Sequence, residues 1–318
     1  MAFPMKASKK TRDSKGPLYV VRLTSDGKYL LTGGQDRTVR LWNPFKTEIE
    51  ATLKLKKEIE SNGLNEVLLV KEFSGGHGYE VKDIIASDDK SKIASCGGDK
   101  MAIVWDVSTG AIKKLPSHQS MINSLSANKD FTVIFTASYD STVKAWDLRA
   151  PGRSPIQTFD NSKDSVTSVL IANEGSEIIT GSIDGCVRTY DIRSGMLHED
   201  RLYEPITFLS LSNDNNCILA SGIKSESLRL LERGSGNILN MYKGHSNKMY
   251  PLGNCFSNTD AAVISGSEDG DVVYWDLVNS KFSKRIRHHK KAVSRVAFHP
   301  KHSMMVSASY DGSAVIYE

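Results

Sequence analysis

The side chains best suited to chemistry in this sequence are its histidines and cysteines. The eight histidines are His77, His118, His198, His245, His288, His289, His299 and His302, and their spacing predicts no metal site. The cysteines, Cys96, Cys186, Cys217 and Cys255, form no C-x-x-C pair, so we expect reduced thiols buried in strands. The sequence contains no G-x-x-x-x-G-K-[ST] loop, no G-x-S-x-G turn and no H-E-x-x-H motif. It therefore predicts a protein that is not an enzyme and that binds no cofactor and no metal.

Composition narrows the class of protein further. The chain has 318 residues, of which 39% are apolar and 25% charged, and this balance favours a folded globular protein over a disordered one. A formal net charge of +4 permits contact with RNA without requiring it. No apolar run is long enough to span a membrane, and residues 1–12 lack the apolar core of a secretory signal. We expect a protein of the nucleus and cytoplasm with no membrane contact.

The elements that would position any functional side chain recur along the chain. Trp-Asp pairs or related pairs begin at seven markers: Trp42, Trp105, Trp146, Tyr190, Leu231, Trp275 and Tyr317. Successive markers are 63, 41, 44, 41, 44 and 42 residues apart. The sequence is therefore a seven-fold repeat in which the first interval contains about 21 additional residues.

Two further positions keep a fixed distance from each marker. Six residues before the markers stand Asp36, Asp99, Asp140, Asp184, Ser225, Asp269 and Asp311. Four residues before those stand Thr32, Ser95, Thr136, Thr180, Ser221, Ser265 and Ser307. Strand-forming runs flank the aspartate, as in residues 262–267 and 271–275, so each unit predicts an antiparallel hairpin with a tight turn.

This pattern resembles the WD-repeat β-propellers along nearly the whole chain. The resemblance implies an all-β fold in which residues 1–318 form one propeller of seven blades with four antiparallel strands each. The sequence ends just after the third strand of the last unit. Because an open sheet edge favours aggregation, we expect a strand within residues 4–15 to close the last blade.

The resemblance also assigns structural roles to the repeated polar residues. In WD-repeat proteins a histidine, the turn aspartate, the hydroxyl residue and the tryptophan form one hydrogen-bonded chain, which satisfies buried polar groups. Three sets are expected here: His77, Ser95, Asp99 and Trp105; His118, Thr136, Asp140 and Trp146; and His245, Ser265, Asp269 and Trp275. His288 or His289 would serve the last unit, whereas the fourth and fifth units lack such a histidine. Ser225 and Leu231 stand where aspartate and tryptophan are usual, so the fifth unit is expected to be recognisable but less tightly held.

The additional residues of the first unit lie within 46–72. Pairs such as Glu50/Lys54 have the four-residue spacing that supports an exposed helix, while Ser61-Asn62-Gly63 suits the turn of a long hairpin. Residues 66–70 are expected to form the outer strand. The segment is either a solvated elaboration or a docking element.

The face that carries the aspartate turns is the expected binding surface. Residues just before the turn aspartates, and residues after the histidine loops, should point toward its rim. Tyrosines at these positions combine a large apolar area with a polar tip, which suits partner binding. The candidates are Tyr79, Tyr139, Tyr250 and Tyr310.

Two groups of basic residues give further candidates. The segment 284–291 is the densest basic run and contains Arg285, Arg287, Lys290 and Lys291, which would attract an acidic protein segment or RNA phosphates. Arg149 and Arg193 end segments that resemble the extended WD-repeat box of substrate receptors in cullin-RING ubiquitin ligases.

Longer matches resemble one group of WD-repeat scaffolds. They include Gly76-His77-Gly78-Tyr79-Glu80-Val81, Tyr242-Lys243-Gly244-His245 and Ser267-Glu268-Asp269-Gly270. The resemblance implies a non-catalytic scaffold that organises a mitogen-activated kinase module, acts in the spliceosome, or does both. Its partners would be splicing factors or kinase-cascade proteins, with RNA contact indirect, and the chain would be a monomer inside a larger complex. The alternative is a ubiquitin-ligase substrate receptor.

Overall fold

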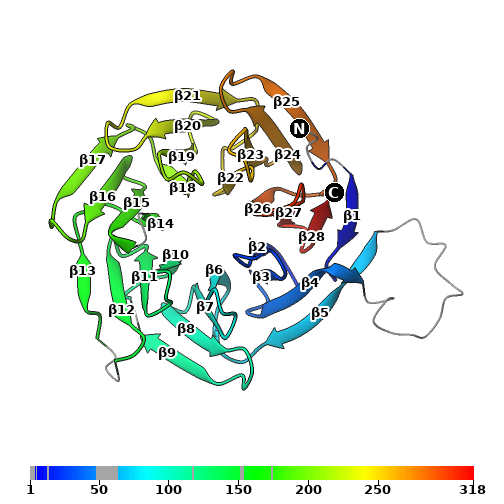
Figure 1. Cartoon of the computed structure of the whole chain (residues 1–318), viewed down its shortest axis with the longest axis horizontal. Helices are drawn as coiled ribbons and strands as arrows, with labels where there is room; N and C mark the ends of the chain where they lie inside the picture. Colours follow the sequence, from blue (N-terminus) through cyan, green and yellow to red (C-terminus); the bar gives the residue numbers. More distant parts are fainter. Residues whose placement is uncertain are drawn as a thin grey trace, which may run out of the picture.

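The computed structural model describes residues 4, 6–12, 14–47, 64–116, 118–150, 154–172 and 175–318. This part of the chain contains 28 strands and no α-helix. The strands form small sheets that stand side by side in a ring around a central channel (Figure 1). No described helix has the length and apolar character needed to cross a membrane.

Five sheets have four strands each, which follow one another from the channel outward. The first two are β6 (Val81–Ala86), β7 (Lys92–Gly97), β8 (Met101–Asp106) and β9 (Ile112–Pro116), then β10 (Ile122–Ala127), β11 (Val133–Ser138), β12 (Val143–Asp147) and β13 (Gln157–Phe159). The next are β14 (Val166–Ala172), β15 (Glu177–Ser182), β16 (Cys186–Asp191) and β17 (Leu197–Arg201), then β18 (Ile206–Leu211), β19 (Cys217–Gly222), β20 (Ser227–Glu232) and β21 (Ile238–Lys243). The last is β22 (Asn254–Phe256), β23 (Ala262–Gly266), β24 (Asp271–Asp276) and β25 (Phe282–Arg287).

A sixth sheet has eight strands and joins the two ends of the chain. Its order is β2 (Leu18–Leu23), β3 (Leu30–Gly34), β4 (Val39–Thr47), β5 (Asn65–Phe73), β1 (Ala7–Lys10), β28 (Ala314–Tyr317), β27 (Met305–Ser309) and β26 (Val293–Phe298). It therefore consists of two four-stranded halves, and the 28 strands fit seven blades.

The N-terminal strand β1 is the outer strand of the second half and joins it to the first half. It pairs antiparallel with β28, with Ala7 opposite Tyr317 and Lys10 opposite Val315, and parallel with β5, with Lys9 opposite Asn65. The backbone of Thr11 continues the contact, since its N–H donates to the Ala314 carbonyl at 2.8 Å. Residues 7–10 thus supply the outer strand of the last half-sheet and cover the edge of β28.

The turn aspartates fold the hairpins locally. In five turns, at Asp36, Asp99, Asp140, Asp184 and Asp311, the carboxylate accepts the backbone N–H two residues later. The residue after the turn position has a positive φ in all seven turns, at Arg37, Lys100, Ser141, Gly185, Glu226, Gly270 and Gly312. Such Asx turns offset the cost of the left-handed residue, which explains why aspartate recurs at this spacing.

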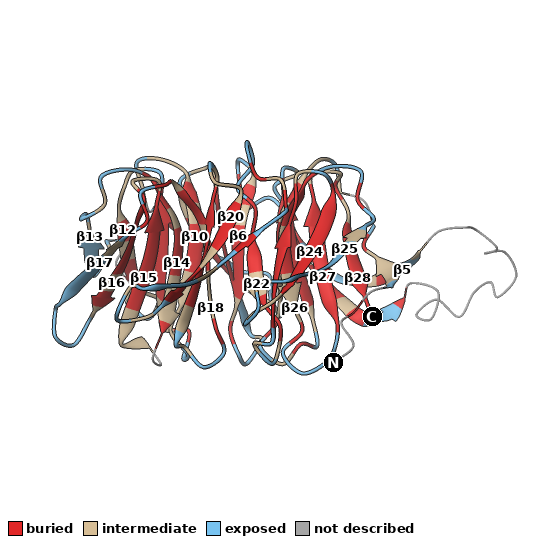
Figure 2. Ribbon diagram, turned by 90° about the horizontal axis from the view of Figure 1, so that it is seen from above, coloured by how far each residue is buried: buried red, intermediate tan, exposed pale blue. Residues whose placement is uncertain are grey.

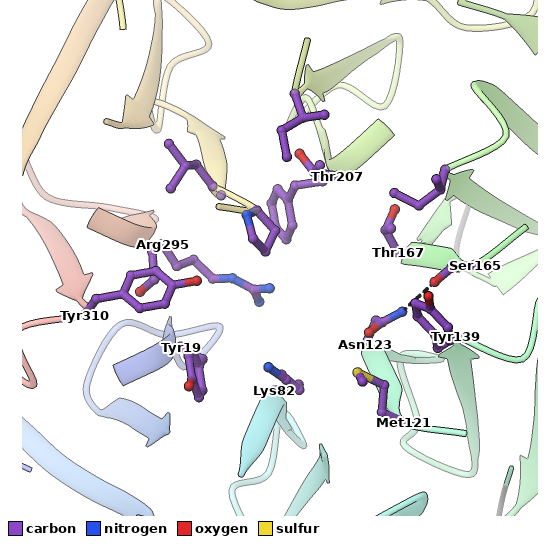
Figure 3. Close-up of a pocket in the computed structure, with 17 residues that line it drawn as sticks. Tyr19, Lys82, Met121, Asn123, Tyr139, Ser165, Thr167, Thr207, Arg295 and Tyr310 are labelled. Carbon is purple, nitrogen blue, oxygen red and sulfur yellow. Dashed lines mark hydrogen bonds between the residues drawn. The ribbon is translucent and has the colours of Figure 1, made fainter. Parts of the chain in front are cut away.

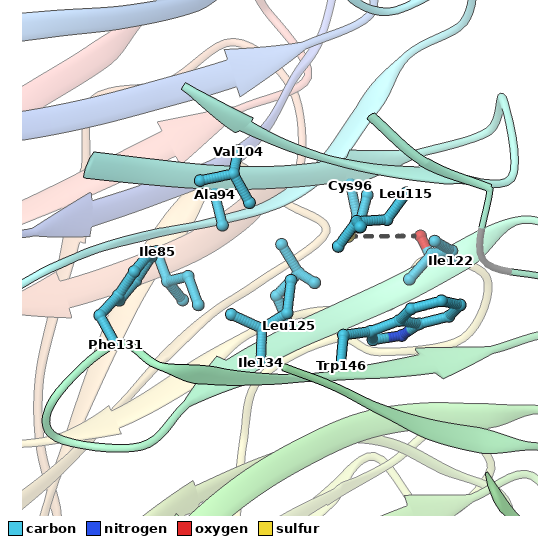
Figure 4. Close-up of a cluster of buried hydrophobic side chains, with 11 residues drawn as sticks. Ile85, Ala94, Cys96, Val104, Leu115, Ile122, Leu125, Phe131, Ile134 and Trp146 are labelled. Atoms are coloured by element: carbon cyan, nitrogen blue, oxygen red, sulfur yellow. Dashed lines mark hydrogen bonds between the residues drawn. The ribbon is translucent and has the colours of Figure 1, made fainter. Parts of the chain in front are cut away.

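The core consists of apolar layers between neighbouring sheets. Ile85 and Val104 of one sheet face Leu125, Ile134 and Trp146 of the next, and all five are buried (Figure 4). Similar clusters follow around the ring, so the strands are buried on both faces while loops and outermost strands such as β13 and β17 face solvent (Figure 2). The four cysteines are free thiols within or beside these layers.

Part of the first unit's additional segment is described. β4 extends to Thr47 and β5 begins at Asn65, so the expected outer strand over 66–70 lies within β5. The proposed helix and the proposed turn at residues 61–63 lie in 48–63, outside the described residues.

Candidate interaction face and central cavity

Two of the three expected polar sets are assembled in the structure. In the β6–β9 sheet, His77 Nδ1 lies 2.8 Å from the Asp99 carboxylate and Nε2 lies 2.7 Å from Ser95 Oγ, which also accepts the Trp105 indole N–H at 2.7 Å. Burial by itself would raise the pKa of Asp99. The bonds to His77 and to backbone N–H groups outweigh this effect, so the pKa of Asp99 is lowered. The carboxylate also accepts the N–H of Gly78 and thereby fixes the loop at the rim.

The next sheet repeats this arrangement with the same atoms. His118 lies 2.9 Å from Asp140 and 2.7 Å from Thr136 Oγ1, which accepts the Trp146 N–H at 3.0 Å. In the last half-sheet, His289 rather than His288 contacts Asp311, at 3.0 Å. Both ring nitrogens of each histidine are engaged and the rings are buried, so these groups hold loops and strands together.

The third expected set is not formed, and this corrects the sequence prediction. Among the described residues, neither ring nitrogen of His245 has a hydrogen-bond partner, and burial lowers its pKa to about 4. Ser265 Oγ donates to the Gly266 carbonyl, and the Trp275 N–H donates to the Lys243 carbonyl. Asp269 has a side chain that is 52% exposed.

Loop length is the physical reason for the difference. The three formed His–Asp pairs are separated by 22 residues, whereas 24 residues separate His245 from Asp269. The two additional residues lie in the loop before β22 and displace the histidine from the aspartate turn. This signal was present in the sequence.

Arginine takes the place of histidine at the turn aspartate in two of the units that lack a histidine, the first and the fourth, which sequence analysis did not predict. Arg188 lies 2.9 Å from Asp184 and 2.7 Å from Glu199, and its side chain is 1% exposed. Arg40 contacts Asp36 in the same way, four residues apart. These arginines precede their markers by two residues, as does Arg229 in the fifth unit, and the units with a histidine have no arginine there.

Beneath the rim, the channel contains a cavity of about 320 Å³ (Figure 3). The innermost strands of six units carry a β-bulge, seen as a register shift at the second strand residue. The bulged residues are Tyr19, Lys82, Asn123, Thr167, Thr207 and Ser294, and all six line the cavity. A bulge leaves its residue outside the ladder and turns its side chain, which explains why these residues face the channel.

The bulged residues differ in their contacts. Asn123, Thr167 and Ser294 donate to backbone carbonyls of the following unit, at 2.8, 2.9 and 2.7 Å. They therefore join neighbouring sheets. Lys82 instead places its Nζ 4.2 Å from the centre of the Tyr19 ring and 3.4 Å from Glu80, and it points into the cavity (Figure 3).

A buried ion cluster supports one wall of this cavity. Asp83, which has no exposed surface, accepts Arg295 Nη1 at 2.7 Å and lies 3.4 Å from Arg22. Its other oxygen accepts the Ser124 hydroxyl at 3.1 Å and the Leu125 N–H at 3.0 Å. Although burial opposes it, the two guanidinium groups lower the pKa of Asp83. The aspartate is therefore an anion that ties together four units of the ring.

The rim tyrosines do not all lie as the sequence predicted. Tyr79 and Tyr139 are 62% and 57% exposed and project from the face that carries the aspartate turns. Tyr310 is not an exposed anchor, because its ring packs against Tyr19 at 5.5 Å and against Tyr250 at 4.7 Å, and burial raises its pKa. Tyr250 remains partly exposed beside it.

The loop before β22 is held at the rim by one carboxylate. Glu268 accepts the backbone N–H groups of Lys248, Met249 and Tyr250, at 2.8, 2.6 and 2.9 Å. This arrangement leaves the Met249 side chain exposed next to Tyr250. Sequence analysis also missed Tyr203, which is 90% exposed on the same face but has no preceding histidine to mark it.

The basic candidates lie apart from the cavity. Arg285 and Arg287 are on the outer strand β25, where Arg285 contacts Asp271 at 3.3 Å. Lys290 and Lys291 are exposed in the loop after β25. Arg149 and Arg193 are exposed just after β12 and β16, and Arg149 forms a two-pronged contact with Asp147 at 3.1 and 3.0 Å.

The face that carries the aspartate turns and the cavity beneath it present groups suited to contact. Among the described residues no cluster of three or more His, Cys, Asp or Glu side chains could hold a metal ion. One face presents exposed aromatic and Met side chains around a cavity with an aromatic wall and two cations. Such a surface can bind a protein segment by apolar contact and charge.

Comparisons with known proteins agree with this architecture. A family model described as "WD domain, G-beta repeat" matches residues 8–43, 236–276 and 280–318, and one described as "Nucleolar protein 10-like, N-terminal domain" matches residues 79–255. The chain is 38% identical over 306 residues to WD repeat domain-containing protein 83 of Homo sapiens, covering 96% of this chain and 90% of that protein. It is 30% identical over 333 residues to the WD repeat domain-containing protein 83 homolog of Dictyostelium discoideum, covering 95% of each.

Proposed function

The chain belongs to the WD-repeat family and is a homologue of WD repeat domain-containing protein 83, and from this premise we propose that it is a non-catalytic scaffold for protein assembly. The whole chain would be a single seven-bladed propeller that acts as a monomer within a larger complex. Its role would be that of mitogen-activated protein kinase organizer 1, which assembles a kinase module, or that of a spliceosome component in the nucleus and cytoplasm.

The observation that carries the proposal is the contrast between the rim and the polar sets. Histidine and aspartate side chains that resemble a catalytic apparatus are buried in loop-fixing bonds, as at His77 and Asp99. Tyr79, Tyr139 and Tyr203 are instead exposed on the same face. A rigid disc with exposed aromatic anchors suits the binding of several partners, and simultaneous binding raises their effective concentration.

The first test is affinity purification of the tagged chain from its own cells, with mass spectrometry and a nuclease-treated control. Splicing proteins that remain after nuclease would support a spliceosomal role through protein contact. Kinase-cascade proteins without splicing factors would support the signalling role. A cullin adaptor that is lost when Arg149 and Arg193 are reversed in charge would support the ubiquitin-ligase alternative.

A matched pair of variants assigns the partners to a surface. Tyr79→Ala combined with Tyr139→Ala should reduce recovery of the partners, because both anchors lie on the proposed face. Phe282→Ala removes an aromatic side chain of similar exposure on the outer strand β25 and should leave recovery unchanged. Equal recovery with both variants would contradict the proposal that this face binds the partners.

A further inference from the structure

The charge of the central cavity is unbalanced. Its 17 lining residues include two cations, Lys82 and Arg295, and no aspartate or glutamate. The carboxylate of Asp83 lies behind the lining and is shared between Arg295 and Arg22, so this cluster of three charges retains a net positive charge. Lys82 is partly balanced by Glu80, which lies 3.4 Å away and is not part of the lining.

The orientation of Arg295 leaves donors available for a ligand. Its Nη1 bonds to Asp83, while the guanidinium lies 4.5 Å from the centre of the Phe208 ring and extends toward the middle of the channel (Figure 3). Burial lowers the pKa of Arg295 against the opposing influence of Asp83, so the charged form lacks solvation. An anion bound beside Arg295 would stabilise the charged guanidinium in place of the missing water.

The second cation faces the same space from a nearby part of the wall, because only the β2 unit separates β6, which carries Lys82, from β26, which carries Arg295. Lys82 is placed there by its bulge, and its ammonium nitrogen lies 4.2 Å from the centre of the Tyr19 ring, so the cation has an aromatic wall on one side. Tyr139, Phe208 and Pro251 complete a largely apolar lining. Cations in such a low-dielectric cleft attract anions more strongly than surface cations do.

The charges favour a single negative charge over a double one. Arg295 shares Asp83 with Arg22, and Lys82 is near Glu80, so about one positive charge is left for a ligand. A carboxylate matches that charge, whereas a phosphate dianion would also meet the negative fields of Glu80 and Asp83. The cavity is also large enough for an amino-acid side chain with its flanking backbone.

We infer that the central cavity binds an acidic side chain, Asp or Glu, of a protein partner whose neighbouring residues contact the tyrosine rim. This inference rests on the proposed function of the face, because the rim supplies the remaining contact. Lys82 and Arg295 would hold the carboxylate, and Phe208 and Tyr19 would cover its apolar stem. A bond between a charged donor and a carboxylate is among the stronger polar contacts.

The test is selection of short random peptides displayed on phage against the purified full chain. Two variants are selected in parallel, Lys82→Met in the cavity and Lys28→Met in the β2–β3 turn. That turn lies at the opposite end of the strands from the aspartate turns, and both changes remove one lysine charge. We expect one position enriched in Asp or Glu with the wild-type chain and with Lys28→Met, and loss of that enrichment with Lys82→Met.

A synthetic peptide from the selection then gives the affinity by fluorescence anisotropy. Replacing its selected Glu by Gln should weaken binding by about tenfold or more, as for a lost charged hydrogen bond. Thermal unfolding of each variant shows that the fold is retained. Peptides without an acidic position, an acidic preference that survives in Lys82→Met, or tighter binding of a phosphoserine version would each overturn the inference.

The outcomes also separate this inference from the proposed function. If cellular partners are lost with the Tyr79 and Tyr139 changes but selection yields no acidic position, the face binds partners and the inference about the cavity is wrong. If acidic peptides depend on Lys82 but partners are retained in the tyrosine variant, the cavity binds an acidic side chain as inferred, whereas the proposed contact of partners with the tyrosine rim is wrong.

Discussion

Arg188 lies 2.9 Å from Asp184 and does in the β14–β17 sheet what His77 does beside Asp99 in the β6–β9 sheet. Both side chains are buried and both bridge the turn aspartate to a second group, Glu199 for the arginine and Ser95 for the histidine. The propeller therefore has two solutions for fixing its turns. The units that use arginine carry it on the strand, four residues after the turn position.

We predict that Arg188→Ala strongly destabilises the fold. The change leaves Asp184 and Glu199 without their buried partner, and breaking a buried pair in this way typically costs about 3–5 kcal/mol. The free energy of unfolding from urea titration measures the effect. Arg193→Ala, at an exposed position just after the end of β16, serves as the control and should change the free energy of unfolding by less than about 0.5 kcal/mol. Equal effects of the two changes would contradict the bridging role.

We predict that two aspartates with the same place in the repeat differ in importance. Asp99→Ala removes the partner of His77 and of the Gly78 N–H, which should cost about 1–3 kcal/mol. Asp269→Ala removes an exposed carboxylate that lacks its histidine, and the cost should be below about 1 kcal/mol. Urea unfolding of both variants gives the comparison, and an equal loss of stability would show that the His245 set forms in solution.

We predict a dependence of stability on pH that originates at His245. Its folded-state pKa of about 4 is below the ordinary value of 6.5, so the unfolded chain binds the proton more readily. Stability is therefore complete above pH ~6.5 and declines as the pH falls toward 4, by up to about 3 kcal/mol. Glu226 and Glu268 raise this pKa, while burial, the largest influence, and Arg285 lower it.

The variant His245→Phe tests that prediction. Because His288 and His299 also have lowered pKa values, the wild-type slope contains their contributions, and the difference between variant and wild type isolates His245. Unfolding free energies measured from pH 7 to pH 4.5 should decline less in His245→Phe. The control His198→Phe, at a half-exposed position, should keep the wild-type slope. Identical slopes for all three proteins would contradict the prediction.

We predict that Tyr310→Ala lowers stability whereas Tyr79→Ala does not. The change at Tyr310 removes two ring contacts, with Tyr19 and with Tyr250. Each such aromatic pair contributes about 0.5–1.5 kcal/mol to stability. Tyr79 is mostly exposed, so its removal should be within about 0.5 kcal/mol of the wild type. Thermal unfolding of the two variants, with thermal midpoints compared at one scan rate, measures the difference. A more stable Tyr310→Ala protein would show that these rings are not packed in solution.

We predict that Asp83→Asn destabilises the ring closure. The amide cannot compensate Arg295 and Arg22, which leaves buried positive charge near the channel and should cost about 3–5 kcal/mol. Hydrogen exchange of the backbone amides should locate the loss in the innermost strands β2, β6 and β26. Protection lost first in the outer strands β9 or β13 would contradict the idea that Asp83 joins the units.

Some of these relationships were available from the sequence. The hydroxyl, aspartate and tryptophan positions repeat within ten residues, and the hairpin that joins them is local, so turn chemistry and strand alternation determine it. The spacing between a histidine and its aspartate can also be taken from the sequence. The interval between His245 and Asp269 is longer than the other three, and it belongs to the expected set that does not form. The arginine two residues before a marker is an equally regular signal. It was not used because the family resemblance directed attention to histidine.

The central cavity could not be predicted in the same way. Arg295 and Asp83 are 212 residues apart and meet only because closure of the ring brings the innermost strands together. The side chains that face the channel are selected by bulges, which change the direction of one residue without a strong mark in the sequence. Local hydrogen bonding thus determined the strands and turns of this protein, whereas the charge, shape and lining of its cavity depend on long-range packing and were decided by the tertiary structure.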